Sequence, residues 1–118
     1  MKAVVVAILA LLSAGIASAH DGKGKHGGQV ADAGDYHVEL VMIGGIVDVY
    51  VTDHDDKPIK IAGYKGLAIL SAGGKSQRIV LEVGDGKLTG KAGGTLPQQP
   101  KGVVQITPPN GRTISAKF

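Results

Sequence analysis

The chain has 118 residues, with 13 basic and 10 acidic side chains, no cysteine, no tryptophan and a formal net charge of +3. The charge is small, the charged positions look scattered along the sequence, and aromatic residues make up only 3% of the chain. A nucleic-acid surface is therefore not expected, because it needs a basic patch and, for single strands, aromatic stacking platforms. The lack of cysteine excludes disulfides and thiolate metal ligands, so stability must come from packing around one modest core.

The beginning of the chain has the features of a secretory signal peptide. A basic residue precedes an unbroken apolar run over residues 3–12, and residues 17–19 read Ala-Ser-Ala, an A-x-A cleavage signal. The apolar run is too short to cross about 30 Å of hydrocarbon, and no second apolar span follows it. We therefore expect an exported protein, periplasmic or secreted, that begins at His20 after removal of residues 1–19 and has no membrane span.

The most informative stretch covers residues 36–56, where two apolar runs flank Gly44 and Gly45. A pair of glycines between two such runs predicts a type I′ hairpin turn. A turn centred there aligns the two strands as Val38 with Val51, Leu40 with Val49, Met42 with Val47, His37 with Thr52, Glu39 with Tyr50, and Val41 with Asp48. The first three pairs form an aliphatic face that packs on a core, and the others form a mostly polar face exposed to solvent.

The remaining chain continues this pattern of short extended segments and turns. Further strands are predicted over residues 29–31, 59–61, 67–70, 77–83, 87–91, 103–107 and 113–118, with a longer Gly- and Pro-rich loop over residues 92–100. We predict three parts: a signal peptide over 1–19, a mobile His/Gly/Lys arm over 20–28, and a domain over 29–118. The expected fold class is all-β, an antiparallel immunoglobulin-like β-sandwich of seven to nine short strands, with a small barrel as the alternative.

The sequence offers little for catalysis. It has no cysteine nucleophile and no G-x-S-x-G motif, and the formal G-x-G-x-x-G match at residues 22–27 neither follows a strand nor opens a helix. The Asp-rich turn over residues 53–58 lacks EF-hand spacing, because Lys57 occupies the third ligand position. We therefore predict a protein that is not an enzyme, and a solvated turn in which Asp side chains bond the local backbone.

All four histidines lie between positions 20 and 54. Imidazole binds Zn and Cu(II) well, whereas a Cu(I) site is disfavoured because cysteine is absent and Met42 lies on the predicted core face. After cleavage, the amine and imidazole nitrogens of His20 could chelate one Cu(II), with a third nitrogen from His26 or His37 and an oxygen from Asp21. The alternative is that His20 is only the first residue of a disordered tail.

Two further positions complete the set of candidate ligands. His37 and Glu39 lie about 7 Å apart on one face of a strand and could form an accessory site, and His54 lies in the Asp-rich turn. The alternative is that these side chains are simply solvated. The candidate metal ligands are therefore His20, His26, His37, Glu39 and His54, and the expected metal is copper(II) or zinc.

Several segments carry a family resemblance: residues 26–30 (HGGQV), 36–41 (YHVELV), 49–53 (VYVTD) and 56–59 (DKPI). They resemble the N-terminal β-sandwich domain of periplasmic heavy-metal efflux adaptor proteins and related small stand-alone periplasmic proteins. The resemblance implies binding of copper, zinc or a related ion, with His26 at the matching position. The chain lacks the coiled-coil hairpin and lipoyl-like part of those adaptors, which favours a free carrier or sensor.

Two functions follow from the sequence. The first is a periplasmic divalent-metal binding protein that acts as a chaperone, a buffer or a metal-resistance accessory and has an efflux or envelope protein as its partner. The second is a non-catalytic envelope protein-interaction module with incidental histidines, which docks through a sheet edge or through the loop over residues 92–100.

Overall fold

The computed structural model describes residues 23–118, which form eight strands and no helix. The strands are β1 (Gln29–Ala33), β2 (Tyr36–Ile43), β3 (Ile46–Asp53), β4 (Lys65–Ala72), β5 (Lys75–Val83), β6 (Leu88–Lys91), β7 (Lys101–Thr107) and β8 (Ile114–Lys117). The predicted signal peptide and His20 lie outside the described residues. Among the residues that are described, none belongs to a helix long and apolar enough to span a membrane.

The central hairpin has the register that its sequence predicts. Val38 pairs with Val51, and Glu39 pairs with Tyr50 across β2 and β3. The turn residues Gly44 and Gly45 have φ angles of 50° and 88°, which fits the two positive φ angles of a type I′ turn. The glycine pair thus determines which side chains of the hairpin face the core.

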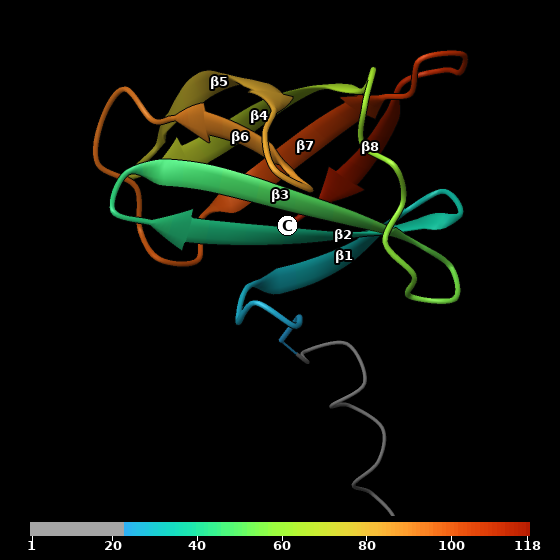
Figure 1. Ribbon diagram of the computed structural model, residues 1–118. Coiled ribbons are helices and arrows are strands. Elements are labelled where there is room, and N and C mark those ends of the chain that lie inside the picture. The colour runs from blue at the N-terminus through green and yellow to red at the C-terminus, as the bar shows by residue number, and fades with distance from the viewer. Residues whose placement is uncertain (1–22) are drawn as a thin grey trace, which may run out of the picture.

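All eight strands belong to one antiparallel sheet with the order β1-β2-β3-β6-β5-β4-β7-β8. The two end strands, β1 and β8, lie against each other, so the sheet curls around a single core and nearly closes (Figure 1). In Figure 1, β1, β2 and β3 form the lower part of the molecule and β4, β5 and β6 the upper part. The all-β antiparallel prediction is confirmed, and the nearly closed sheet is closer to the barrel alternative than to an immunoglobulin-like sandwich of two separate sheets.

The core consists almost entirely of aliphatic side chains that point into the curled sheet. Leu40, Leu70, Leu88, Val104 and Ile106 are each 2% exposed or less. They come from four different strands, β2, β4, β6 and β7, because alternate residues of each strand point inward. Burial of this apolar area is the main term that holds a chain without disulfides together.

One predicted strand is absent. Residues 59–61 form no ladder, and this connection touches the sheet through a single bridge between Thr52 and Pro58. Ile61 is nevertheless 8% exposed and packs in the core cluster. The apolar residues of this segment therefore anchor a loop, a role that period-two alternation does not distinguish from a strand.

Candidate functional site

The outer face of β1, β2 and β3 carries a cavity of about 560 Å³. The sheet register places Val30, Glu39 and Tyr50 in one row of this face and Asp32, His37 and Thr52 in the next. A turn over residues 23–26 forms a further wall. Side chains that are distant in sequence therefore meet in one concave surface, which is where ligand sites are usually found.

Glu39 is the anchor of this surface. Its side chain is 9% exposed, and its Oε2 atom accepts hydrogen bonds from the backbone N–H groups of His26 at 2.9 Å and Gly28 at 2.8 Å. Its Oε1 atom lies 2.8 Å from Nδ1 of His26. A buried carboxylate requires such partners, and here all three come from one short segment. We expected solvent on this face, but the segment covers Glu39.

The covering segment is a tight turn. The N–H of Gly24 donates to the carbonyl of Gly28, and the N–H of Gly27 donates to the carbonyl of Gly24, each at 2.9 Å. A Cβ at Gly24 would overlap the Glu39 carboxyl group, and a Cβ at Gly28 would overlap the Leu40 carbonyl. The glycines, which suggested a mobile arm over residues 20–28, therefore allow residues 23–28 to approach the sheet closely.

The imidazole of His26 is held on two sides. Its ring stacks on Tyr50 with 3.6 Å between centroids and 7° between planes. Because an ionised carboxylate only accepts hydrogen bonds, the proton of a neutral His26 ring lies on Nδ1 and its Nε2 keeps a free lone pair. The side chain is 44% exposed and lines the cavity.

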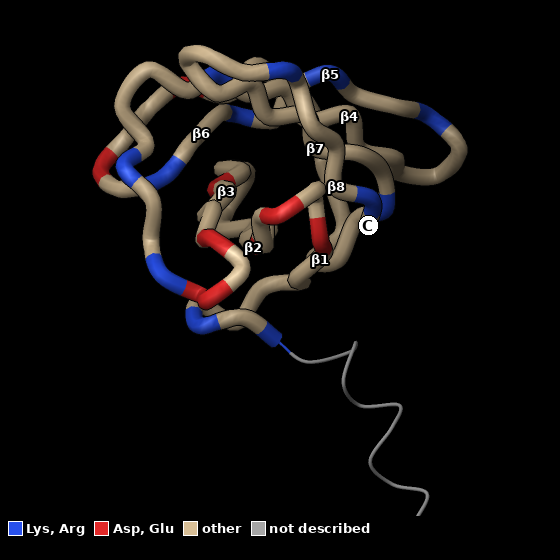
Figure 2. Tube along the Cα trace, turned by 90° about the vertical axis from the view of Figure 1, so that its right-hand side faces the viewer, with Lys and Arg blue, Asp and Glu red and all other residues tan. Residues whose placement is uncertain are grey.

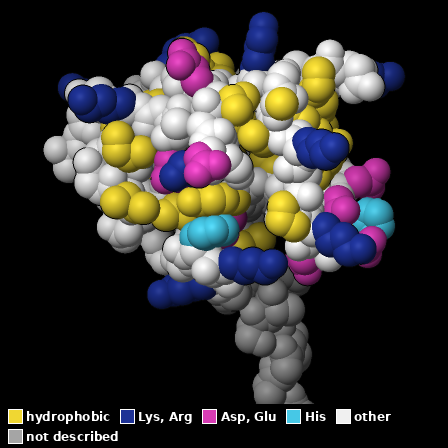
Figure 3. Space-filling view, viewed as in Figure 1, with side chains coloured by type: hydrophobic (Ala, Val, Ile, Leu, Met, Phe, Trp, Pro, Cys, Tyr) yellow, Lys and Arg dark blue, Asp and Glu magenta, His cyan; other side chains and the backbone are white. Residues whose placement is uncertain are grey.

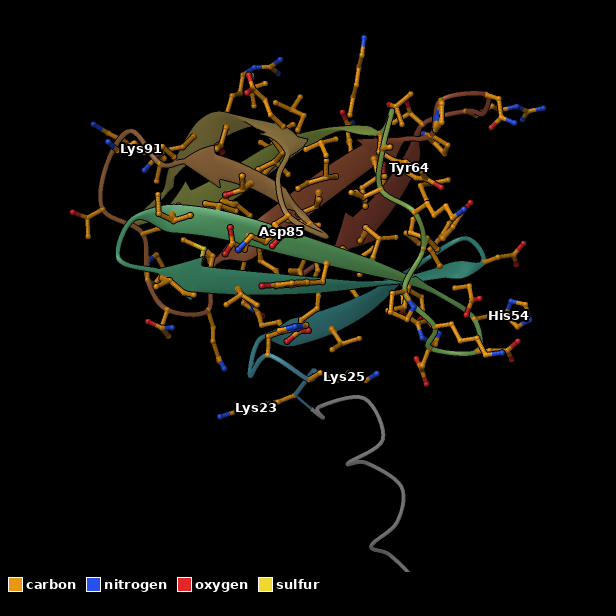
Figure 4. All side chains as sticks on the ribbon, in the orientation of Figure 1. Lys23, Lys25, His54, Tyr64, Asp85 and Lys91 are labelled. Atoms are coloured by element: carbon orange, nitrogen blue, oxygen red, sulfur yellow. The ribbon has the colours of Figure 1, made fainter. Side chains whose placement is uncertain are left out.

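The space-filling view separates two kinds of histidine environment. Imidazole surface appears in the middle of the face shown in Figure 3, beside hydrophobic side chains, and again at the right-hand edge among acidic side chains. The second position is that of His54, which Figure 4 labels. In the same view Lys23 and Lys25 point outward from the covering turn in opposite directions (Figure 4).

A second polar cluster lies beside Tyr50. Asp48 is 4% exposed, accepts a 2.6 Å hydrogen bond from the Thr89 hydroxyl and binds Nζ of Lys87 at 3.1 Å. The hydrogen bond and the charge of Asp48 raise the pKa of Lys87 above its usual value. Nζ of Lys87 also lies 5.8 Å from the centre of the Tyr50 ring, so Tyr50 links this cluster to His26.

His37 lines the same cavity but has different partners. Its Nδ1 lies 2.7 Å from Oδ1 of Asp56, and its Nε2 lies 3.5 Å from Oδ1 of Asp32. The side chain of His37 is 32% exposed. Glu39, which the sequence suggested as a possible partner of His37 in an accessory site, binds His26.

His54 lies apart from this cavity in the Asp-rich turn. Its side chain is 72% exposed and its Nε2 lies 3.6 Å from Oδ2 of Asp55. The Asp53 carboxylate accepts the N–H groups of Lys57 and Asp55, and these bonds lower the pKa of Asp53. The predicted solvated turn with Asp side chains bonded to local backbone is confirmed.

The structure thus brings three of the five candidate ligands together: His26, His37 and Glu39 line one cavity. His20 lies outside the described residues. Within residues 23–118, no three His, Cys, Asp or Glu side chains are grouped closely enough to hold a metal ion. Sequence reasoning missed the role of Tyr50, although the predicted register already placed it opposite Glu39.

Comparisons of the chain with models of known protein families, with curated proteins and with solved structures find no match.

Proposed function

We propose that this chain is an exported, periplasmic protein that binds a divalent transition metal, copper(II) or zinc, as a chaperone, buffer or metal-resistance accessory. The observation that supports this is the pair of His26 and Glu39. Metal-ligating histidines almost always donate their other ring N–H to a carboxylate or carbonyl, which fixes the tautomer and the direction of the ligating nitrogen. In this proposal Nε2 of His26 is the ligand, and Glu39 orients it without touching the metal.

The other ligands in the proposal are His37 and His20. His37 lines the cavity with His26 and also has Nδ1 bound to a carboxylate, at 2.7 Å from Asp56. His20, with its free amine after cleavage, would complete a set of nitrogen ligands of the kind that Cu(II) and Zn favour. His54 is not a ligand in this proposal, because it lies outside the cavity.

The packing around His26 suits a site that must keep its shape without metal. Stacking on Tyr50 and the bond to Glu39 restrict both rotations of the imidazole. A ligand that is already oriented loses less conformational entropy when it binds. The partner in the proposal is an efflux or envelope protein that delivers or accepts the ion, in line with the resemblance to efflux adaptors.

The test is calorimetric titration of the protein, purified from the periplasm of an expressing bacterium, with Cu(II) and with Zn(II). We expect binding of one of them with a Kd below about 10 μM, and about tenfold or greater weakening by His26→Ala. The matched control His54→Ala should leave affinity unchanged. A Kd above that limit for both metals, or equal losses in the two variants, would contradict the proposal.

A further inference from the structure

A row of two apolar side chains with a basic side chain at each end crosses the side of the molecule away from the cavity. The register aligns Arg78 of β5 with Ile69 of β4, Ile69 with Val103 of β7, and Val103 with Lys117 of β8. These residues point outward, because their neighbours in sequence, such as Leu70 and Val104, belong to the core. The register, which no single strand reveals, assembles this surface from four strands.

The next row adds further aliphatic side chains. Val80 pairs with Leu67 across β5 and β4, and Val80 is 67% exposed. Together, Leu67, Ile69, Val80 and Val103 form an aliphatic patch on the outer face of the sheet. An antiparallel sheet usually carries polar residues on its solvent face, and apolar groups that gather there mark surfaces that contact another molecule.

The aliphatic patch has a basic rim. Four exposed cations surround it on the same outer face: Lys65, Arg78, Lys101 and Lys117. The four strands β4, β5, β7 and β8 contain one acidic residue, Glu82, and no aromatic residue. Glu82 lies on this face too, two residues from Val80, so the edge of the surface carries four cations and one anion around an aliphatic centre.

The two halves of the described chain differ in charge. Residues 65–118 contain 8 basic and 2 acidic side chains, whereas residues 23–64 contain 4 basic and 7 acidic side chains. In Figure 2 most acidic positions lie around β1, β2 and β3, below the strands that carry the patch. An encounter with an acidic partner would therefore favour the patch side, because long-range attraction orients the approach.

We propose that the aliphatic patch and its basic rim are a docking surface for an acidic segment of another protein that carries aliphatic side chains of its own. An apolar centre with a charged rim is the usual organisation of a protein interface. A bilayer is the weaker candidate, because membrane-surface segments rely on Trp, Tyr or Phe at the interface, and these four strands have none. Docking here leaves the cavity over β1, β2 and β3 free and does not depend on metal binding.

The test uses a fluorescent synthetic peptide of alternating Glu and Leu as the probe, with anisotropy as the readout for the full exported protein. The comparison peptides alternate Lys with Leu, and Glu with Ser. We expect the Glu/Leu peptide to bind and both comparison peptides to bind at least about tenfold more weakly, since the surface needs opposite charge and apolar contact. Binding of the Glu/Ser peptide as tightly as Glu/Leu, or no binding of Glu/Leu, overturns the proposal.

Charge-reversal variants test whether the peptide binds at the aliphatic patch. The double variant Arg78→Glu, Lys117→Glu should bind the Glu/Leu peptide about tenfold or more weakly. The control double variant Lys57→Glu, Lys60→Glu makes the same charge change away from the patch, and its affinity for the peptide should stay within about twofold. Equal losses in the two pairs would mean that only net charge matters, and overturn the assignment.

The apolar contribution and the competing surface are tested separately. Val80→Ser removes an exposed side chain of the patch, so the variant should fold normally. Its affinity for the Glu/Leu peptide should fall several-fold. Unchanged affinity would contradict the assignment. Phosphatidylglycerol vesicles test the bilayer directly. Vesicle binding that exceeds peptide binding and is lost in the Arg78 and Lys117 variant would show a membrane surface, and the proposed protein partner would be wrong.

Discussion

His26 and His37 line the same cavity, and each has Nδ1 close to a carboxylate, at 2.8 Å from Glu39 and 2.7 Å from Asp56. The carboxylates differ in environment, because the side chain of Glu39 is 9% exposed and that of Asp56 is 69% exposed. An exposed ion pair contributes about 0–1 kcal/mol, whereas buried groups that lose their partners cost about 1–3 kcal/mol each. Two bonds of nearly equal length therefore fix one imidazole firmly and the other only weakly.

The largest effect is expected from Glu39→Ala. This change leaves the N–H groups of His26 and Gly28 without their acceptor and releases the covering turn, so the free energy of unfolding should fall by about 1–3 kcal/mol. Metal affinity should fall as well, because Nε2 of His26 is no longer held in one tautomer and direction. Urea unfolding and hydrogen exchange at the Gly28 amide measure the first effect, and calorimetry measures the second.

The control for that change is Asp56→Asn, because Asp56 has a positive φ of 63°, which Asn tolerates better than Ala. It removes the charge that faces His37 but acts on an exposed group, so we expect a change in stability below about 1 kcal/mol. If the two variants lose equal stability, the comparison between the buried and the exposed carboxylate is wrong.

A smaller effect is expected from Gly24→Ala. The added Cβ overlaps the Glu39 carboxyl group, so the turn or the carboxylate must shift, and the three bonds to Glu39 weaken together. Gly27→Ala is the informative control, because a Cβ there meets no atom within 4 Å and the cost of its φ of 80° is about 1 kcal/mol. We expect NMR shifts of the His26 ring to change strongly only in Gly24→Ala; similar changes in both variants would show that close approach to Glu39 does not matter.

The hairpin shows why part of this structure could be predicted from the sequence. Gly44 and Gly45 specify the turn, the turn specifies the register, and alternation then assigns Val38 to the core and Glu39 to the opposite face. These are local rules, and they hold because a slip of one residue would expose the whole aliphatic face. The same rules predicted seven to nine strands, and residues 23–118 form eight.

Local sequence rules could not predict the order of the strands in the sheet or the position of the covering turn. β3 pairs with β6, and β4 pairs with β7, and such neighbours depend on how the whole chain closes around its core. His26 was correctly noted as a candidate, yet its bond to Glu39 joins positions 13 residues apart through a turn. Glycines at Gly24 and Gly28 look like flexibility in the sequence, because the carbonyl and carboxyl groups that they approach are unknown until the fold is known.

Asp48 is a second buried carboxylate to compare with Glu39. It is about as buried as Glu39 but has a lysine as its partner. The pKa of Lys87 is raised above the usual 10.5 by its bond to Asp48. A raised pKa of a basic group means that its pairing stabilises the fold fully below pH 10.5 and that this contribution disappears as pH rises through the higher folded-state pKa.

The smallest expected effect is therefore a difference in unfolding free energy that decreases as the pH rises. Lys87→Met should be less stable than the unmodified protein at neutral pH, and the difference between their unfolding free energies should shrink above pH 10.5. Urea unfolding of both proteins at several alkaline pH values measures the difference, in which the titrations that the two share cancel. A difference that stays constant across this range would mean that the charge of Lys87 contributes nothing, and that the Thr89 hydroxyl and the sheet alone stabilise the buried Asp48 carboxylate.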